Sequence, residues 1–406
     1  MTRKLTLDFL RTEAASGAIL ALAALCALLA ANSPLRDAYF GLLKTEVPIQ
    51  IGGWREVETV SEWVKEGLMA IFFFVVGLEI KYEVLKGELS NPRRLAMPVL
   101  AALGGMIAPA LVYAAVNAGA GGDLRGWSIP VATDIAFALA ALAVVGRMLP
   151  PSLRVFLLTL AIADDLGAVA IIAVAYSRDL HVEAMAGALG ALALMWLIGR
   201  LRRPPAVFYV AAFLLVWGFT LESGISTSLA GVFAAMTVPI AARVQGAEGP
   251  LKNFMETLHP WVAYLILPLF AFSASGFSFA GLGLEGLTAP VTLGIALGLF
   301  FGKQIGVFGA AALAVASGLA RKPTGATWPE IYGVSALCGI GFTMSLFLGA
   351  LAFPAGDDAL ASEVKLGVIG GSLLSAIAGL AVLSRAAAVR RRRMVADQEI
   401  DATASI

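Results

Sequence analysis

The sequence predicts an all-α polytopic membrane protein, and three observations carry this prediction. The 406 residues are 59% hydrophobic and only 14% charged, whereas soluble domains carry about 25% charged residues. Apolar runs recur that are about 17 to 25 residues long, the length that a helix needs to cross a bilayer. The runs are apolar at odd and even positions alike, which excludes the alternating strands of a membrane barrel.

The apolar runs predict twelve transmembrane helices. Arg3, Lys4 and Arg11 precede the first run, as in a signal sequence, but we expect an uncleaved helix because this basic region is long for a signal and eleven further spans follow. The predicted spans cover residues 13–31, 60–80, 95–117, 127–146, 152–175, 183–199, 205–221, 224–241, 257–281, 289–317, 329–352 and 362–385.

The distribution of basic residues predicts the orientation of these spans. Lys and Arg concentrate in alternate loops, which places both termini in the cytoplasm. We therefore expect a cytoplasmic N-terminal tail (1–12), a twelve-helix membrane domain (13–388) and a basic, disordered cytoplasmic tail (389–406). The external loop 32–59 contains a predicted hairpin with a Gly52–Gly53 turn.

Charge and cysteine content limit the partners of the chain. The net charge of +1 gives no overall field that would attract nucleic acid. The basic run Arg390–Arg393 follows the last span, and we interpret it as an anchor to anionic lipid of the bilayer. Cys26 and Cys338 lie inside apolar spans without metal-ligand spacing, so both are expected to be core residues.

Full charges are rare within the spans, and four of them stand out. Asp164 and Asp165 lie in the fifth span, Asp134 in the fourth and Lys303 in the tenth. One charge at the bilayer centre costs roughly 2.5 to 3.5 kcal/mol on insertion scales, so such residues usually serve a function. Lys303 either forms a buried ion pair that only fixes helix packing or pairs with one acid and leaves the other free to ionise; we favour the second reading.

Two spans carry signals for interruption. In the fourth span, Pro130 removes a backbone donor, while Thr133 and Asp134 can bond the backbone locally. In the eleventh, Gly339 and Gly341 weaken the helix. Two breakable helices, one in each half of the chain, indicate a site in mid-membrane where half-helix ends meet, although simple kinks would leave the same signal.

Three further polar residues lie near predicted cytoplasmic ends of helices. Glu79 is deeper than Lys81 and Glu83 and could face a cytoplasmic funnel. His259, with Glu256 three residues earlier, could sense pH, because histidine titrates near neutrality. A simple interfacial cap explains His259 and Glu256 equally well.

At these motifs the chain resembles the NhaA family of bacterial sodium/proton antiporters. The matching segments run in family order over about residues 11 to 388, and the match is specific. They are Gly77–Lys81, Ala132–Leu139, Ala163–Ala168, Leu258–Tyr264, Gly302–Lys303 and Gly341–Ser345.

The resemblance implies twelve helices, an inverted pair formed by spans 3–5 and 10–12, and discontinuous helices 4 and 11 that cross near the bilayer midplane. It also implies roles: Asp165 as the direct cation ligand, Asp164 as the acid paired with Lys303, Asp134 as the balance for the facing half-helix ends, and Thr133 as a neighbouring ligand.

The function implied is electrogenic exchange of cytoplasmic Na⁺ or Li⁺ for external H⁺, two protons per cation, regulated by pH. It would serve sodium export and pH homeostasis in the bacterial inner membrane. The resemblance implies that the protein needs no cofactor and that it forms a homodimer. The chain departs from the family at Ser226, aligned with a histidine linked to pH response, and at Tyr82, aligned with an arginine.

Three other functions fit the sequence less well. A sodium-coupled solute symporter needs a polar site for an organic substrate, and no such cluster of residues is evident. An intramembrane aspartyl protease needs Gly-x-Gly-Asp, which precedes none of the buried acids. A retinal attachment at Lys303 does not suit twelve spans.

Overall fold

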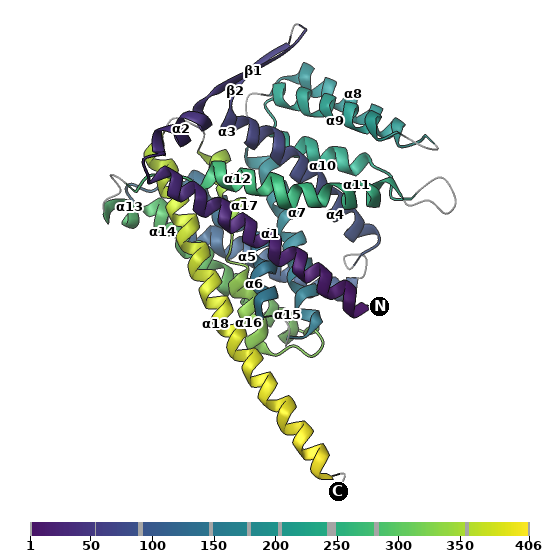
Figure 1. Ribbon diagram of the computed structural model, residues 1–406, viewed down its shortest axis with the longest axis vertical. Coiled ribbons are helices and arrows are strands. Elements are labelled where there is room, and N and C mark those ends of the chain that lie inside the picture. The colour runs from purple at the N-terminus through teal and green to yellow at the C-terminus, as the bar shows by residue number, and fades with distance from the viewer. Residues whose placement is uncertain are drawn as a thin grey trace. The chain divides into compact units, whose positions relative to one another are not determined.

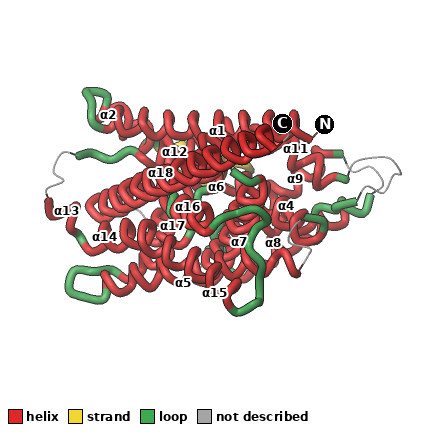
Figure 2. Tube along the Cα trace, turned by 90° about the horizontal axis from the view of Figure 1, so that it is seen from below, coloured by secondary structure: helices red, strands yellow, loops and turns green. Residues whose placement is uncertain are grey.

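A computed structural model describes residues 2–52, 54–87, 92–145, 149–176, 180–201, 205–241, 249–279, 284–353 and 357–404. The described chain is almost entirely helical (Figures 1 and 2). It divides into two compact units, the first made of Met1–Ala18, Asn91–Asp164 and Gly283–Ile406 and the second of Ile19–Ser90 and Asp165–Leu282. Two helices, α1 (Thr2–Ala31) and α7 (Pro151–Ala175), contribute to both units.

The predicted polytopic membrane protein is confirmed, with six to eight apolar spans in the described residues. Six continuous helical segments are long and apolar enough to cross a membrane: Leu95–Asn117, Leu124–Val145, Pro151–Ala175, Pro250–Ser275, Pro290–Ala316 and Ala359–Met394. Two bent pairs add Ala15–Ala31 with Arg36–Lys44 and Trp328–Leu337 with Phe342–Ala352, while Val182–Ile198, Ala206–Glu222 and Thr227–Thr237 are shorter apolar helices. The count of twelve stays a prediction.

The helices of the first unit approach one another closely at glycine residues, which have no side chain. A Cβ at Gly104 of α5 would lie 2.3 Å from the Gly306 carbonyl oxygen, and one at Gly302 would lie 2.6 Å from Pro109 Cα. These approaches bring the long helix that carries Lys303 against α5. The unit contains α5 (Pro92–Asn117), the 3-10 helix η3 (Leu124–Val131), α6 (Ile135–Val145), α13 (Leu284–Thr288), α14 (Pro290–Leu297), the π-turns η6 (Gly298–Gly302) and η7 (Gln304–Phe308), α15 (Gly309–Ala316), α16 (Trp328–Leu337), α17 (Phe342–Ala352) and α18 (Asp358–Ala404).

α18 continues much farther than the predicted twelfth span. It runs to Ala404 (yellow in Figure 1), whereas the sequence led us to expect a span of 362–385 and a disordered tail from 389. The segment after Gly379 contains no Gly or Pro and is rich in Ala and Arg, which are strong helix formers. Helix propensity therefore carries α18 beyond the apolar part of its sequence.

The second unit contains the predicted hairpin and, besides its parts of α1 and α7, eight α-helices and two π-turns among the described residues. β1 and β2 pair antiparallel from Glu46↔Thr59 to Ile51↔Trp54, and Gly52 has the positive φ of 61° that the predicted tight turn requires. The elements are α2 (Arg36–Lys44), β1 (Glu46–Ile51), β2 (Trp54–Thr59), α3 (Val60–Trp63), η1 (Val64–Leu68), α4 (Met69–Leu85), α8 (Val182–Ile198), α9 (Ala206–Glu222), α10 (Thr227–Thr237), α11 (Pro250–Trp261), η5 (Val262–Ile266) and α12 (Leu267–Ser275).

The predicted span 257–281 is displaced toward the N-terminus in the structure. Its helix begins at Pro250 and ends at Ser275, because proline suits the first helical position and Gly276 is extended. Two turns that include Lys252 and Glu256 therefore precede the apolar part of the helix, and apolar length alone could not reveal them.

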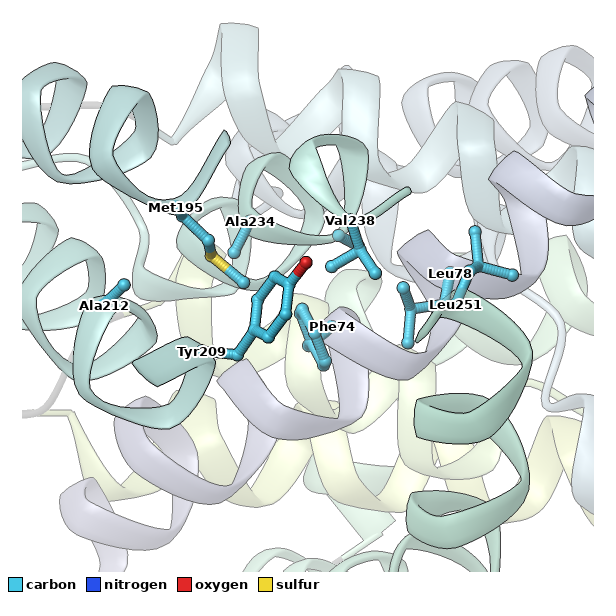
Figure 3. Close-up of a cluster of buried hydrophobic side chains, with 9 residues drawn as sticks. Phe74, Leu78, Met195, Tyr209, Ala212, Ala234, Val238 and Leu251 are labelled. Atoms are coloured by element: carbon cyan, nitrogen blue, oxygen red, sulfur yellow. The ribbon is translucent and has the colours of Figure 1, made fainter. Parts of the chain in front are cut away.

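An apolar core joins α4 and α8 to α11 of the second unit, as Figure 3 shows. Tyr209 lies at its centre, and its ring packs edge-to-face on Phe254 at a centroid distance of 5.2 Å. α4 and α10 approach so closely that a Cβ at Gly231 would lie 2.2 Å from the Ala70 carbonyl oxygen. Lys81 caps the C-terminal end of α10, donating from Nζ to the Met236 and Val238 carbonyls at 2.6 Å each.

Candidate functional site

The two adjacent acids lie near the middle of α7, a continuous apolar helix. Asp164 is fully buried and Asp165 is 4% exposed. Successive positions of a helix point about 100° apart, so the two carboxylates face different surroundings. Asp164 closes the part of α7 that belongs to the first unit, and Asp165 begins the part that belongs to the second.

Lys303 forms a buried ion pair with Asp164. Its Nζ lies 2.5 Å from Asp164 Oδ2, and neither side chain has any exposed surface. Lys303 stands between the π-turns η6 and η7, which widen the helix and change the direction of the side chains it carries. A Cβ at Gly105 of α5 would lie 2.6 Å from Val307 Cγ2, so glycine at this position lets α5 pack closely against the turn that follows Lys303.

Thr133 joins the ion pair to the backbone of a second interrupted segment. Thr133 Oγ1 lies 2.6 Å from Asp164 Oδ2 and 2.8 Å from the Cys338 carbonyl oxygen. One hydroxyl proton cannot serve two acceptors at once. The three oxygens of Thr133, Asp164 and Cys338 therefore make two close contacts, and the Thr133 hydroxyl has one proton to share between them. The other carboxylate oxygen, Asp164 Oδ1, is buried without a hydrogen-bond partner among the described residues.

Two non-helical segments lie side by side at this point. After η3, Ala132 is extended, and α6 begins only at Ile135. α16 ends at Leu337, α17 begins at Phe342, and the two helices are bent by 43°. The Asp134 amide donates to the Ile340 carbonyl at 2.7 Å, so the free backbone groups of one segment satisfy those of the other.

Asp134 receives hydrogen bonds from the first turns of two helices. Its Oδ1 accepts from the Phe137 amide of α6 at 3.1 Å. Its Oδ2 accepts from the Thr343 amide of α17 at 3.0 Å and from the Thr343 hydroxyl. Helix N-termini carry partial positive charge and unsatisfied amides, so one buried carboxylate stabilises both ends.

Serine side chains, which the sequence interpretation missed, fasten the same region. Ser345 Oγ donates to the Ile129 carbonyl of η3 at 2.6 Å. Ser372 Oγ of α18 accepts from the Gly341 and Phe342 amides at 3.2 Å each. The signal available in the sequence was weak, because buried serines usually bond within their own helix.

The remaining candidate residues lie in the second unit and outside this hydrogen-bonded group. Glu79 is partly buried on α4. Glu256 of α11 forms an exposed ion pair with Lys252 at 3.4 Å, and His259 lies one turn farther on, partly buried. Ser226 is the N-cap residue of α10, and its hydroxyl bonds Ser228 at 3.2 Å.

A polytopic helical protein that buries acids, a lysine and two opposed helix starts in its interior has the kind of ionisable site that membrane transporters use. Residues 7–383 match the family described as Na⁺/H⁺ antiporter 1. The chain belongs to this family. It is similar to Na(+)/H(+) antiporter NhaA 2 of Pseudomonas syringae pv. syringae (strain B728a), with 50% identity over 377 residues that cover 93% of this chain and 94% of that protein.

Two further relatives are similar over the same extent. Na(+)/H(+) antiporter NhaA of Bordetella parapertussis (strain 12822) is 51% identical over 92% of this chain and 95% of its own length. The protein of the same name from Caulobacter vibrioides (strain ATCC 19089) is 49% identical over 99% of this chain and 96% of its own length. Antiporters need no cofactor, since the ions they move are their substrates.

Proposed function

We propose that the protein exchanges cytoplasmic Na⁺ or Li⁺ for external protons by alternating access, at a site formed by Asp164, Asp165 and Thr133. The observation that carries this proposal is the sharing of Asp164 Oδ2 by Lys303 and Thr133 while Oδ1 lacks a partner among the described residues. A carboxylate held in this way has a free oxygen for either a proton or a small cation.

The donor atoms suit a small hard cation. Na⁺ and Li⁺ prefer oxygen ligands, as other hard cations do. The Thr133 hydroxyl oxygen and the Cys338 carbonyl oxygen lie 2.8 Å apart, and the Asp164 carboxylate reaches the same hydroxyl. A cation among these oxygens would also remove the conflict between two acceptors and one hydroxyl proton.

Competition at the acids supplies the coupling. A cation and a proton both require the same ionised carboxylates, so binding one releases the other. When the cation is absent, the Lys303 ammonium lies 2.5 Å from the Asp164 carboxylate and is the positive charge that balances it. A bound cation would stand in the place of that positive charge.

Two opposed helix ends allow the site to change access. Asp134 holds α6 and α17 to one carboxylate, so the interrupted segments can move as half-helices without exposing unpaired amides. We propose that the two interrupted segments are the discontinuous helices 4 and 11. We further propose that spans 3–5 and 10–12, which contain them, form an inverted repeat.

The exchange is proposed to be electrogenic, with two protons per cation. Each turnover then moves one net charge, worth about 2.3 kcal/mol per 100 mV, so an inside-negative potential drives cation export. We further propose a homodimer in the inner membrane with both termini cytoplasmic, and a pH response that differs from the family pattern because Ser226 cannot titrate near neutrality. A sodium-coupled symporter is the alternative, and the family match disfavours it.

Proteoliposomes test the proposal. Asp164→Asn and Asp165→Asn should each abolish proton movement driven by Na⁺ or Li⁺, while size-exclusion chromatography shows an intact protein. Asp123→Asn is the matched control, because this acid lies outside the site and pairs with Arg125 at 2.5 Å. The proposal would be refuted if both site variants retained Na⁺-driven proton movement. It would also be refuted if an organic solute drove proton movement in the wild type.

A further inference from the structure

Arg390 differs from the other arginines of the basic run on α18. Arg391, Arg392 and Arg393 are exposed, whereas Arg390 is half-buried. Its guanidinium donates to both carboxylate oxygens of Glu330, from Nε at 2.9 Å and from Nη2 at 3.0 Å, and to the Gly325 carbonyl at 2.7 Å. An arginine held by three hydrogen bonds from Nε and Nη2 is fixed in the protein and is not a free anchor for lipid.

Glu330 takes part in the capping box at the N-terminus of α16. Its side chain is 1% exposed, and its Oε2 accepts from the Thr327 amide at 2.7 Å in a capping box. Arg390 therefore binds the same carboxylate that fixes the first turn of α16.

The other end of α16 lies at the proposed cation site. α16 has ten residues and is thus about 15 Å long, and the next residue is Cys338, whose carbonyl contacts Thr133. The helix lies flush on α18, since a Cβ at Gly333 would lie 2.6 Å from Leu383 and one at Gly379 would lie 2.5 Å from Leu337. Such close packing lets the position of the first turn determine the position of the last.

The loop before α16 is also tied to the helix that carries Asp164. Ser152, in the first turn of α7, donates to the Thr324 carbonyl at 2.7 Å. Residues 324–327 are thus held to α7 by Ser152 and to α18 by Arg390, and Gly325 has a φ of +74° that permits the turn between these contacts.

We propose that Arg390 is a positioning residue for transport. Its ion pair with Glu330 sets the position of α16 along α18 and thereby places the Cys338 carbonyl against Thr133. The ion pair acts on cation affinity through this helix, from a residue that lies beyond the apolar part of α18. This inference rests on the proposed function of the Thr133 site.

The test measures the apparent KM for Na⁺ and the maximal rate of Na⁺-driven proton movement in everted vesicles, across pH. Arg390→Ala should raise the KM by about 2- to 30-fold, the range of energetic coupling seen between distant residues and a site. The maximal rate per folded protein should change less. Arg392→Ala removes the same charge from the same run and should leave both constants unchanged.

Two further variants separate positioning from a general loss of structure. Arg390→Lys keeps the charge but not the forked geometry, so its KM should lie between those of the wild type and Arg390→Ala. Glu330→Gln removes the partner charge, and adding Arg390→Ala to it should then have little further effect, because residues that act as one unit are not additive. If Arg390→Ala does not fold, Arg390→Lys and Glu330→Gln decide the question.

A wild-type KM in Arg390→Ala would overturn the inference. Wild-type KM values in both single variants Arg390→Lys and Glu330→Gln would overturn it as well. An equal change in Arg392→Ala would overturn it as well, since the effect would then follow from surface charge alone. These outcomes leave the proposed function intact as long as the wild type moves protons in response to Na⁺ and Asp164→Asn does not. Absence of that wild-type response would instead refute the proposed function.

Discussion

Replacing Thr133 by valine removes one hydroxyl from the centre of the site while nearly preserving the side-chain volume. The hydroxyl oxygen contacts the Asp164 carboxylate at 2.6 Å and the Cys338 carbonyl at 2.8 Å, and Thr133 has no exposed surface. An oxygen contact to a charged group is worth about 1.5 to 3 kcal/mol net. If this oxygen is a cation ligand, the apparent Na⁺ affinity should fall about ten- to hundred-fold.

Dequenching of a pH-sensitive dye in everted vesicles gives the apparent KM for Na⁺ and for Li⁺. Thr133→Ser keeps the hydroxyl and should stay close to the wild type. Thr220→Val is the matched control, because Thr220 is also buried but its hydroxyl bonds the Val216 carbonyl of its own helix, at 2.7 Å, and no other group among the described residues. A wild-type KM in Thr133→Val, or an equal rise in Thr220→Val, would refute the reasoning.

Two further predictions concern packing and pH. Gly104→Ala should lower the thermal unfolding midpoint, at a cost of about 1 to 3 kcal/mol from overpacking, because the new Cβ meets the Gly306 carbonyl at 2.3 Å; Gly309→Ala, with open space around it, should not. Burial and a hydrogen bond with Glu62 raise the pKa of Glu58 to about 7 from its ordinary 4.5. Because the folded-state pKa is the higher one, the stabilisation of the hairpin is complete below pH 4.5 and is lost as pH rises through about 7. Amide exchange in the hairpin, corrected for intrinsic rates, should speed up over this range, and Glu58→Gln should remove the change.

The sequence predicted the charged members of the site because each is costly in an apolar helix. Asp134, Asp164 and Lys303 stand out in their spans, and the structure brings Lys303 and Asp164 into contact. The interruptions near Pro130 and Gly339 were also visible, because proline and glycine weaken helices irrespective of tertiary structure.

The sequence could not reveal which partners the buried groups choose. The contacts of Thr133 with the Cys338 carbonyl and of Asp134 with Thr343 join residues more than 200 positions apart. A backbone carbonyl leaves no trace in the residue type, and neither do the π-turns on either side of Lys303, which pack against α5. Arg390 looked like its three neighbours in the run, and only the position of Glu330 distinguishes it.

The central claim is that a cation and a proton compete for the same buried acids, and proton release on cation binding tests it most directly. Purified protein in weakly buffered detergent solution is titrated with NaCl while a pH dye records released protons, with choline chloride as the ionic-strength control. The account predicts that Na⁺ and Li⁺ release protons from the wild type and that Asp164→Asn and Asp165→Asn release markedly fewer. Sodium binding without proton release, or release that is unchanged in both variants, would contradict it.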